Sequence, residues 1–81
     1  MSEKIGEVTH YFTDIEVGII KLEDKLEVGD KIRVKGSTTD FEQEVTSMEI
    51  DREEVEESGA GESVGMKVKE RVREGDEVYK L

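Results

Sequence analysis

Short runs in which apolar residues alternate with charged ones, each bounded by glycine-containing turns, constrain the fold of this chain most strongly. Residues 31–35 alternate charged and β-branched side chains, and the turn-forming pair Gly29-Asp30 precedes them directly. Residues 66–72 repeat the alternation after a glycine-rich bend at 59–65. A period of two residues is that of a strand with one buried face. The sequence therefore predicts an all-β fold.

The remaining segments refine this prediction. Residues 15–22 are apolar on both parities, as in a strand that is covered on both sides or bulged within a barrel. Residues 41–50 change parity near Thr46-Ser47, where we expect a bulge. Only residues 51–57 lack strand periodicity, and they allow one helical turn at most. We expect about six or seven strands, closed into a small Greek-key-like barrel.

One hairpin is specified in detail. A four-residue loop at 36–39 joins two strands and sets their register. That register places three pairs of opposite charges across from one another on the solvent face: Lys35 with Asp40, Arg33 with Glu42, and Lys31 with Glu44. Each such pair contributes roughly 0.2–1 kcal/mol, so the charges and the register support each other.

Two glycines are expected to be required by the backbone. Gly29 and Gly61 stand where the pattern needs a tight turn, and we expect both at positive φ. A β-branched residue is not tolerated there, because its Cβ clashes with the backbone in that conformation.

Length and composition set the size and the compartment. The 81 residues are expected to form one domain, residues 1–81, with a thin core. The chain has no cysteine, which excludes disulfides and thiolate metal sites. Its longest uninterrupted apolar stretches are two residues long, far short of a membrane span or a signal sequence. We therefore expect a cytoplasmic protein without membrane contact.

The charge balance limits the partners. Asp and Glu number 22 against 12 Lys and Arg, so the net charge is −10 and the chain as a whole repels nucleic acid and anionic membranes. A charged fraction of 42% is typical of thermophilic proteins. Disorder is the competing explanation, but a solvated tail has no reason to keep apolar residues at period two.

The chain is poor in catalytic groups, so we expect no enzyme. His10 is its only histidine and shares strand parity with Val8, which favours a structural, partly buried and hydrogen-bonded role. The acidic run 51–57 lacks the spacing of a calcium loop, and the glycines of the chain form no phosphate-binding loop. We therefore expect no metal site, no cofactor and no autonomous GTP binding.

One group of basic residues departs from the acidic average. Lys67, Lys69, Arg71 and Arg73 fall on a single parity of one predicted strand. This basic segment has no acidic partner that the sequence identifies. It is either a solvated strand face or a stripe that binds phosphates, as in a non-specific RNA contact.

Two blocks of sequence resemble a known family. Residues 26–36, with the order Val-Gly-Asp and then alternating residues to a glycine, and residues 60–65, Ala-Gly-Glu-Ser-Val-Gly, are similar to blocks in the second domain of translational GTPases such as elongation factor Tu and initiation factor 2. The resemblance covers about residues 5–78 and implies a β-barrel without its GTPase domain. It rests on turn and packing positions, which transfer fold rather than function.

A second resemblance is to short stand-alone elongation factor-like proteins and to a related barrel appended to the collagenase-like peptidase family. Residues 4–12 and 38–43 carry it. Some members of that peptidase family act in tRNA hydroxylation, so the resemblance keeps RNA among the possible partners.

Two functions follow as expectations. In the first, the chain is a monomeric, non-catalytic adaptor that contacts tRNA or a ribonucleoprotein through Lys67, Lys69, Arg71 and Arg73. In the second, it is a protein-interaction module that docks an enzyme or GTPase partner in trans and does not bind nucleic acid.

Overall fold

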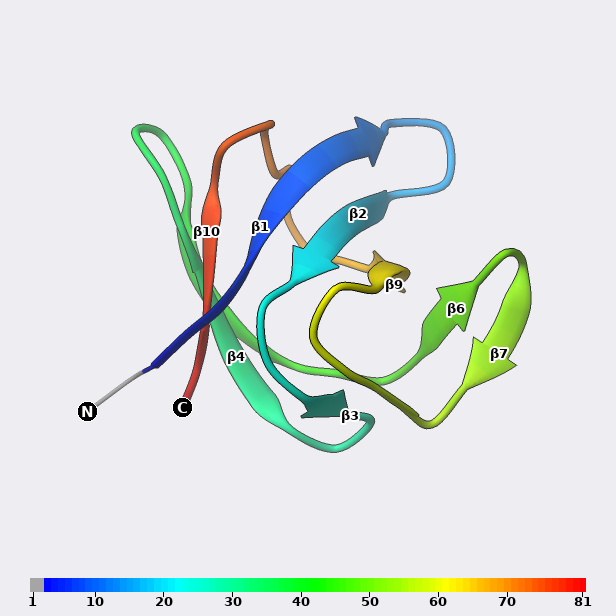
Figure 1. Cartoon of the computed structure of the whole chain (residues 1–81). Coiled ribbons are helices and arrows are strands. Elements are labelled where there is room, and N and C mark those ends of the chain that lie inside the picture. The colour runs from blue at the N-terminus through cyan, green and yellow to red at the C-terminus, as the bar shows by residue number, and fades with distance from the viewer. Residues whose placement is uncertain (1–2) are drawn as a thin grey trace.

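The computed structural model describes residues 3–81, and all regular structure within them is β-strand (Figure 1). The all-β prediction is thereby confirmed. The strands are β1 (Glu3–Phe12), β2 (Val17–Leu22), β3 (Leu26–Glu27), β4 (Lys31–Lys35), β5 (Asp40–Glu44), β6 (Met48–Ile50), β7 (Glu53–Val55), β8 (Glu57–Ser58), β9 (Ser63–Lys67) and β10 (Glu77–Lys80). Among these residues there is no helix that is long and apolar enough to cross a membrane.

Eight of the strands form one curled antiparallel sheet in the order β5-β4-β10-β1-β2-β9-β6-β7, and β3 pairs with β8 separately. The backbone ladder curls around the core without closing on itself, and β6 and β7 project from it as a hairpin (Figure 1). The strand count of the main sheet exceeds the expected six or seven. Its backbone ladder ends at β5 and at β7 within residues 3–81.

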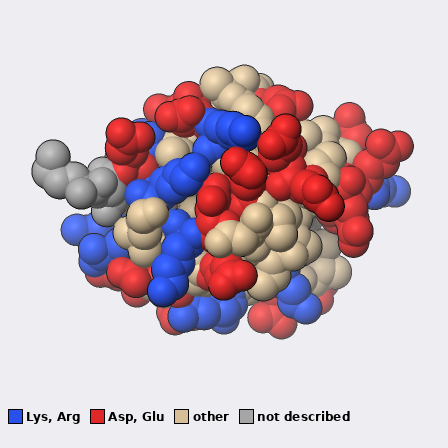
Figure 2. Space-filling view, turned by 90° about the horizontal axis from the view of Figure 1, so that it is seen from below, with Lys and Arg blue, Asp and Glu red and all other residues tan. Residues whose placement is uncertain are grey.

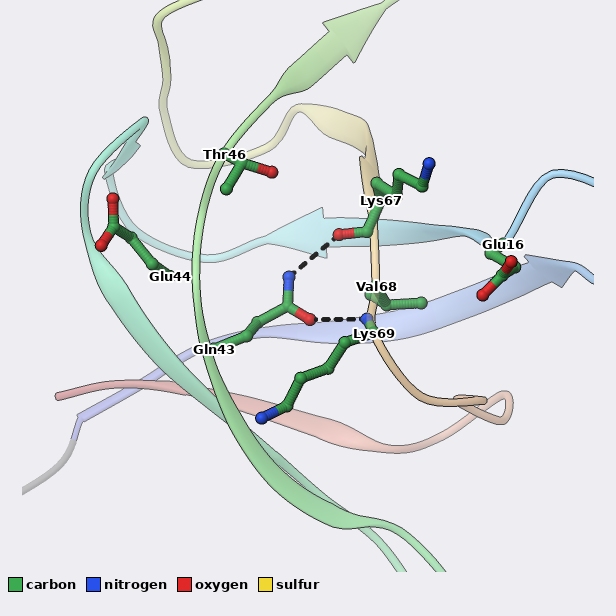
Figure 3. A pocket seen from close by; sticks show the side chains of 7 residues that line it. All are labelled: Glu16, Gln43, Glu44, Thr46, Lys67, Val68 and Lys69. Atoms are coloured by element: carbon green, nitrogen blue, oxygen red, sulfur yellow. Dashed lines mark hydrogen bonds between the residues drawn. The ribbon is translucent and has the colours of Figure 1, made fainter.

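A glutamine side chain closes the gap between the first and the sixth strand of this order. Gln43 on β5 donates from Nε2 to the Lys67 carbonyl at 2.9 Å, and its Oε1 accepts from the Lys69 N–H at 2.9 Å (Figure 3). One side-chain amide thus makes the two hydrogen bonds that a neighbouring strand would make. In the order of the sheet, the six strands are β5, β4, β10, β1, β2 and β9. They therefore form a ring that is sealed by a side chain.

The core fills the inside of this ring. Alternate residues of the strands point inward and are almost fully buried, as the period-two pattern predicts. The buried apolar residues are Ile5, Val8, Ile20, Leu22, Leu26, Ile32, Val34, Phe41, Val45, Met48, Val64, Met66, Val68, Val72 and Val78. Burial of such side chains is the main stabilising contribution in a domain of this size.

The hairpin between β4 and β5 has the predicted register. The three pairs expected from the sequence are the ones observed: Lys35 with Asp40, Arg33 with Glu42, and Lys31 with Glu44. The ion pair itself is diagonal, because Arg33 forms two bonds of 2.8 Å to the Asp40 carboxylate rather than binding Glu42. These bonds hold the pKa of Asp40 below its ordinary value.

At the expected bulge, Thr46-Ser47, the chain stops pairing with one neighbouring strand and begins to pair with others. β5 ends at Glu44, and the Val45 N–H still bonds to the Asp30 carbonyl at 2.8 Å. The chain then leaves β4 and begins β6, which pairs with β9 and β7. The parity change was therefore read correctly, but it marks the end of one strand and the start of another.

The single helical turn allowed over residues 51–57 is absent from the structure, which has the β6–β7 hairpin in its place. Asp51 and Arg52 form its two-residue turn at φ values of 51° and 68°. Two successive positive φ values give a turn the twist that a β-hairpin requires, so a hairpin forms without the usual glycine.

The two turn glycines have the predicted conformation. Gly29 has a φ of 100° and Gly61 a φ of 89°. A Cβ at either position would meet no other atom within 4 Å, so the requirement for glycine comes from the backbone and not from crowding.

Candidate binding surfaces

The basic segment, Lys67, Lys69, Arg71 and Arg73, is exposed along its whole length. Of the residues between its cations, Val68 and Val72 are buried and Glu70 is exposed, and all four basic side chains are exposed as predicted. Within residues 3–81 none of the four forms an ion pair, although Arg73 donates from Nε to the Thr38 hydroxyl at 2.9 Å. The cations are therefore available to an anionic partner.

The segment is not one strand, which corrects the sequence prediction. β9 ends at Lys67, and residues 68–73 continue without regular structure. The ladder stops because the next N–H groups bond elsewhere: Val68 donates to the Glu16 carbonyl at 3.0 Å and Lys69 to the Gln43 side chain. The predicted alternation of inward and outward residues is kept at Val68 and Val72, which are buried, but not at Glu70, which is exposed.

The four cations divide between two shallow hollows. Lys67 and Lys69 line one, together with the carboxylates of Glu16 and Glu44. Figure 3 shows the two lysine side chains leaving the Gln43 bridge in opposite directions, so they do not converge on one point. Two carboxylates in the same hollow weaken its attraction for a phosphate.

Arg71 and Arg73 line the second hollow, with His10 and Glu74. His10 is exposed rather than partly buried, and its Nδ1 lies 3.7 Å from the Glu74 carboxylate. The cause is a bulge in β1 between Val8 and His10, which shifts the register and ends their shared parity. The structure therefore separates the arginines from the lysines and places acidic groups beside both pairs.

A second surface, which the sequence reading did not identify, lies on the outer face of β2. We call it the apolar groove. Its walls come from the β1–β2 turn, from β2 and from β9, and its volume is about 470 Å³. The apolar lining consists of Phe12, Ile15, Val17, Ile19 and Gly65, and the polar rim of Glu49, Asp51, Arg52 and Ser63.

The apolar lining is open to solvent to an unusual degree. Ile15 is 60% exposed and Phe12 43% exposed, while Val17 and Ile19 are half-buried. The both-parity apolar pattern of residues 15–22 was the signal for this surface. We expected the outer parity of β2 to be covered or bulged, but within residues 3–81 no other segment covers it.

The acidic charge is unevenly distributed over the molecule. In the view from below, acidic side chains dominate the end formed by β6 and β7, and basic side chains gather in a band toward the N terminus (Figure 2). The rim of the apolar groove belongs to the acidic end, with Glu49 and Asp51 against one cation, Arg52.

The shifted pKa values belong to the scaffold rather than to either surface. The Gly59 N–H and the Ser58 hydroxyl both donate to Glu62 at 2.9 Å and lower its pKa. A 2.6 Å bond from the Tyr79 hydroxyl lowers the pKa of Glu77. Among residues 3–81 no group of three or more potential ligand side chains is placed to hold a metal ion.

Comparison with known proteins gives one sequence relative. No protein-family model matches the chain. A protein of Methanocaldococcus jannaschii, described as an uncharacterized protease, is 42% identical over 79 residues, which is 96% of this chain. The match covers 19% of that protein, so the chain spans about a fifth of the length of its curated relative.

Two solved structures have the same fold. Both are of the C-terminal domain of a Geobacillus thermoleovorans protein described as a U32 peptidase, with TM-scores of 0.90 and 0.91 and 18% sequence identity. They cover 94% and 98% of this chain and 96% and 92% of that domain. The resemblance to a domain of the collagenase-like peptidases, the U32 family, is thereby supported at the level of fold.

Proposed function

We propose that this chain is a non-catalytic binding module that docks onto a larger protein in trans. The observation that carries the proposal is the apolar groove, because exposed apolar patches with a polar rim are typical of protein–protein contacts. The relative supports it, since a similar segment makes up a fifth of a longer protein there. A partner of the U32 peptidase kind is therefore the first to test.

The side chains of the described residues favour a non-catalytic role. A general base needs a nucleophile or a second carboxylate held within hydrogen-bond reach. His10 has Glu74 beside it at 3.7 Å, and both side chains are more than half exposed. Neither group is held in the fixed, partly dry setting in which acid–base catalysis is effective.

The docking proposal is tested with the Methanocaldococcus jannaschii relative from which the segment matching this chain has been removed. The 81-residue chain is added to that truncated protein, and complex formation is followed by size-exclusion chromatography and calorimetry. We expect a complex with a dissociation constant of about micromolar order, as is common for non-obligate contacts. Separate elution at concentrations about a hundredfold higher would contradict the proposal.

RNA is the second candidate partner, because the four cations of the basic segment are exposed and form no ion pair within residues 3–81. The net charge of −10 opposes such binding. We expect binding to be indifferent to sequence, since Lys and Arg on an exposed segment meet phosphates rather than base edges. Tyr11 lines the hollow of Arg71 and Arg73 and is the one Phe, Tyr or Trp side chain described there. Affinity would lie in the range of about 10⁻⁴–10⁻⁶ M, with a log–log salt slope of roughly −0.7 for each phosphate neutralised.

Retention of bulk tRNA at low salt tests this second candidate. The double variant Lys69→Glu, Arg71→Glu should abolish retention and leave the fold intact, because both side chains are exposed. If wild-type protein is not retained at about 50 mM salt, the basic segment is a solvated surface.

The resemblance to the second domain of translational GTPases remains a prediction, and it would make a GTPase the docking partner. We also propose that the chain is a monomer without autonomous GTP binding.

A further inference from the structure

The floor of the apolar groove is formed where a strand lacks a side chain. Gly65 on β9 pairs with Ile19 on one side and with Glu49 on the other. A Cβ at this position would lie 3.4 Å from both Ile19 Cδ1 and Val17 Cγ1, so it would fill the space between them. The recess therefore follows from glycine at position 65 and from the apolar side chains beside it.

Two unusual turns border the groove. Glu16 in the β1–β2 turn has a φ of 54°, and Asp51 and Arg52 in the β6–β7 turn have φ values of 51° and 68°. Positive φ is uncommon for residues other than glycine and costs about 1–3 kcal/mol each. Asparagine and glycine usually occupy such turns. In this hairpin the turn instead presents an acidic and a basic side chain to the rim of the groove.

Two like charges lie opposite one another beside the groove. Glu49 on the rim stands directly opposite Glu54 in the β6–β7 ladder. Like charges directly opposite one another destabilise a strand pair. A cationic partner would relieve this repulsion, whereas a second copy of the chain would bring the same acidic rim against itself. RNA would meet the same unfavourable charge.

We infer that the apolar groove binds a protein segment that presents two or more apolar side chains flanked by lysine or arginine. Apolar side chains of the partner fill the recess over Gly65, and its cations face Glu49 and Asp51. Charge complementarity of this kind selects the partner and speeds association. The inference rests on the proposed docking function and specifies its surface and the chemistry of its partner.

Two synthetic peptides with the same leucine pattern, one flanked by lysines and the other by glutamates, serve as probes. Binding is measured by calorimetry and mapped by NMR shifts of backbone amides. We expect the lysine-flanked peptide to shift the amides of residues 15–19 and of Gly65, and the glutamate-flanked peptide to bind at least about tenfold more weakly.

Matched variants separate the groove from general attraction to an acidic protein. Ile15→Asp should weaken binding of the lysine-flanked peptide about tenfold or more, because it places a charge in the apolar lining. Val28→Asp adds the same charge at an apolar residue that is 40% exposed and lies outside the groove, and it should leave binding unchanged. Both sites are exposed, so both variants should fold.

Equal effects of Ile15→Asp and Val28→Asp, shifts confined to other surfaces, or no binding of the lysine-flanked peptide would each overturn the inference. The outcome is independent of the docking test. If the truncated Methanocaldococcus jannaschii protein binds wild type and Ile15→Asp equally, docking stands and the groove assignment fails. If that protein does not bind but the peptide occupies the groove, the groove assignment stands and the proposed partner fails.

Discussion

Individual residues in this domain owe their identity to two separate constraints, backbone conformation and space. Gly61 is required by its φ of 89°, although a Cβ there would meet no atom within 4 Å. Gly6 is required by space, since a Cβ would lie 2.8 Å from the Lys21 carbonyl and from Ile20 Cγ2. Glycine is therefore required at these two positions for different reasons.

The backbone constraint predicts a difference between two neighbouring glycines. Gly61→Val should lower the free energy of unfolding by at least about 1 kcal/mol, because valine is strained at positive φ. Gly59→Val is the matched control, since a Cβ at Gly59 also meets no atom within 4 Å but its φ is not positive. Thermal and urea unfolding of both variants measures the difference. Equal losses would show that the φ of Gly61 is not the constraint.

Glu62 is expected to make stability depend on pH. The Gly59 N–H and then the Ser58 hydroxyl lower the pKa of Glu62 in the folded chain below its ordinary 4.5. The ionised form is therefore bound more favourably by the fold, so its contribution is present above the unfolded pKa and is lost as pH falls through the folded pKa. Glu62→Gln should lower stability at neutral pH and flatten the decline between about pH 5 and pH 3.

Urea unfolding of wild type and Glu62→Gln across this pH range checks the expectation. A decline should remain in the variant, because the pKa values of Asp40 and Glu77 are lowered as well. Parallel curves for the two proteins would contradict the role given to Glu62. Glu42→Gln is a suitable control, since it removes an exposed carboxylate of β5, away from Glu62 in the chain.

At the scale of the strands, the ring is closed by a side chain and not by backbone pairing. Gln43 joins β5 to residues 67–69 through two bonds of 2.9 Å. The Lys67 carbonyl and the Lys69 N–H would otherwise need water at the seam. One side chain therefore replaces a short stretch of ladder at the point where β9 ends.

Removing this closure should be visible at one amide. Gln43→Leu should speed hydrogen exchange of the Lys69 N–H. It should also lower the free energy of unfolding by about 1 kcal/mol, the usual net contribution of a hydrogen bond that water can replace. Native-state exchange followed by NMR measures both. Val34 on β4 provides the internal reference, since it pairs with Phe41 of β5 through the backbone ladder. Unchanged exchange at Lys69 would show that the seam does not depend on Gln43.

The elements also show what the sequence could and could not predict. The β4–β5 register follows from loop length and cross-strand charges, both of which are local, and it was predicted pair by pair. The transfer from β5 to β6 and the end of β9 at Lys67 depend on which strands become neighbours, which periodicity does not specify. Gln43 bonds to Lys67 and Lys69, which follow it in the chain by 24 and 26 positions. A contact over this separation leaves no local signal in the sequence.

At the scale of the whole molecule, two surfaces offer different partners. The basic segment was predicted from the sequence, and its exposure is as expected, but the fold divides it between two hollows that also contain carboxylates. The apolar groove was not predicted, because alternation shows that β2 has two apolar faces without showing whether both are covered. The groove has a larger volume than either of those hollows, and its rim contains two carboxylates, Glu49 and Asp51, against one cation, Arg52.

A single binding assay that compares the two surfaces tests most directly whether docking uses the apolar groove. Wild type, Ile15→Asp and the double variant Lys69→Glu, Arg71→Glu are each titrated with the truncated Methanocaldococcus jannaschii relative by calorimetry. Docking through the groove predicts that Ile15→Asp weakens the complex about tenfold or more, while the double variant binds as wild type does. Loss of binding in the double variant with Ile15→Asp unaffected would contradict the account and place the contact on the basic segment.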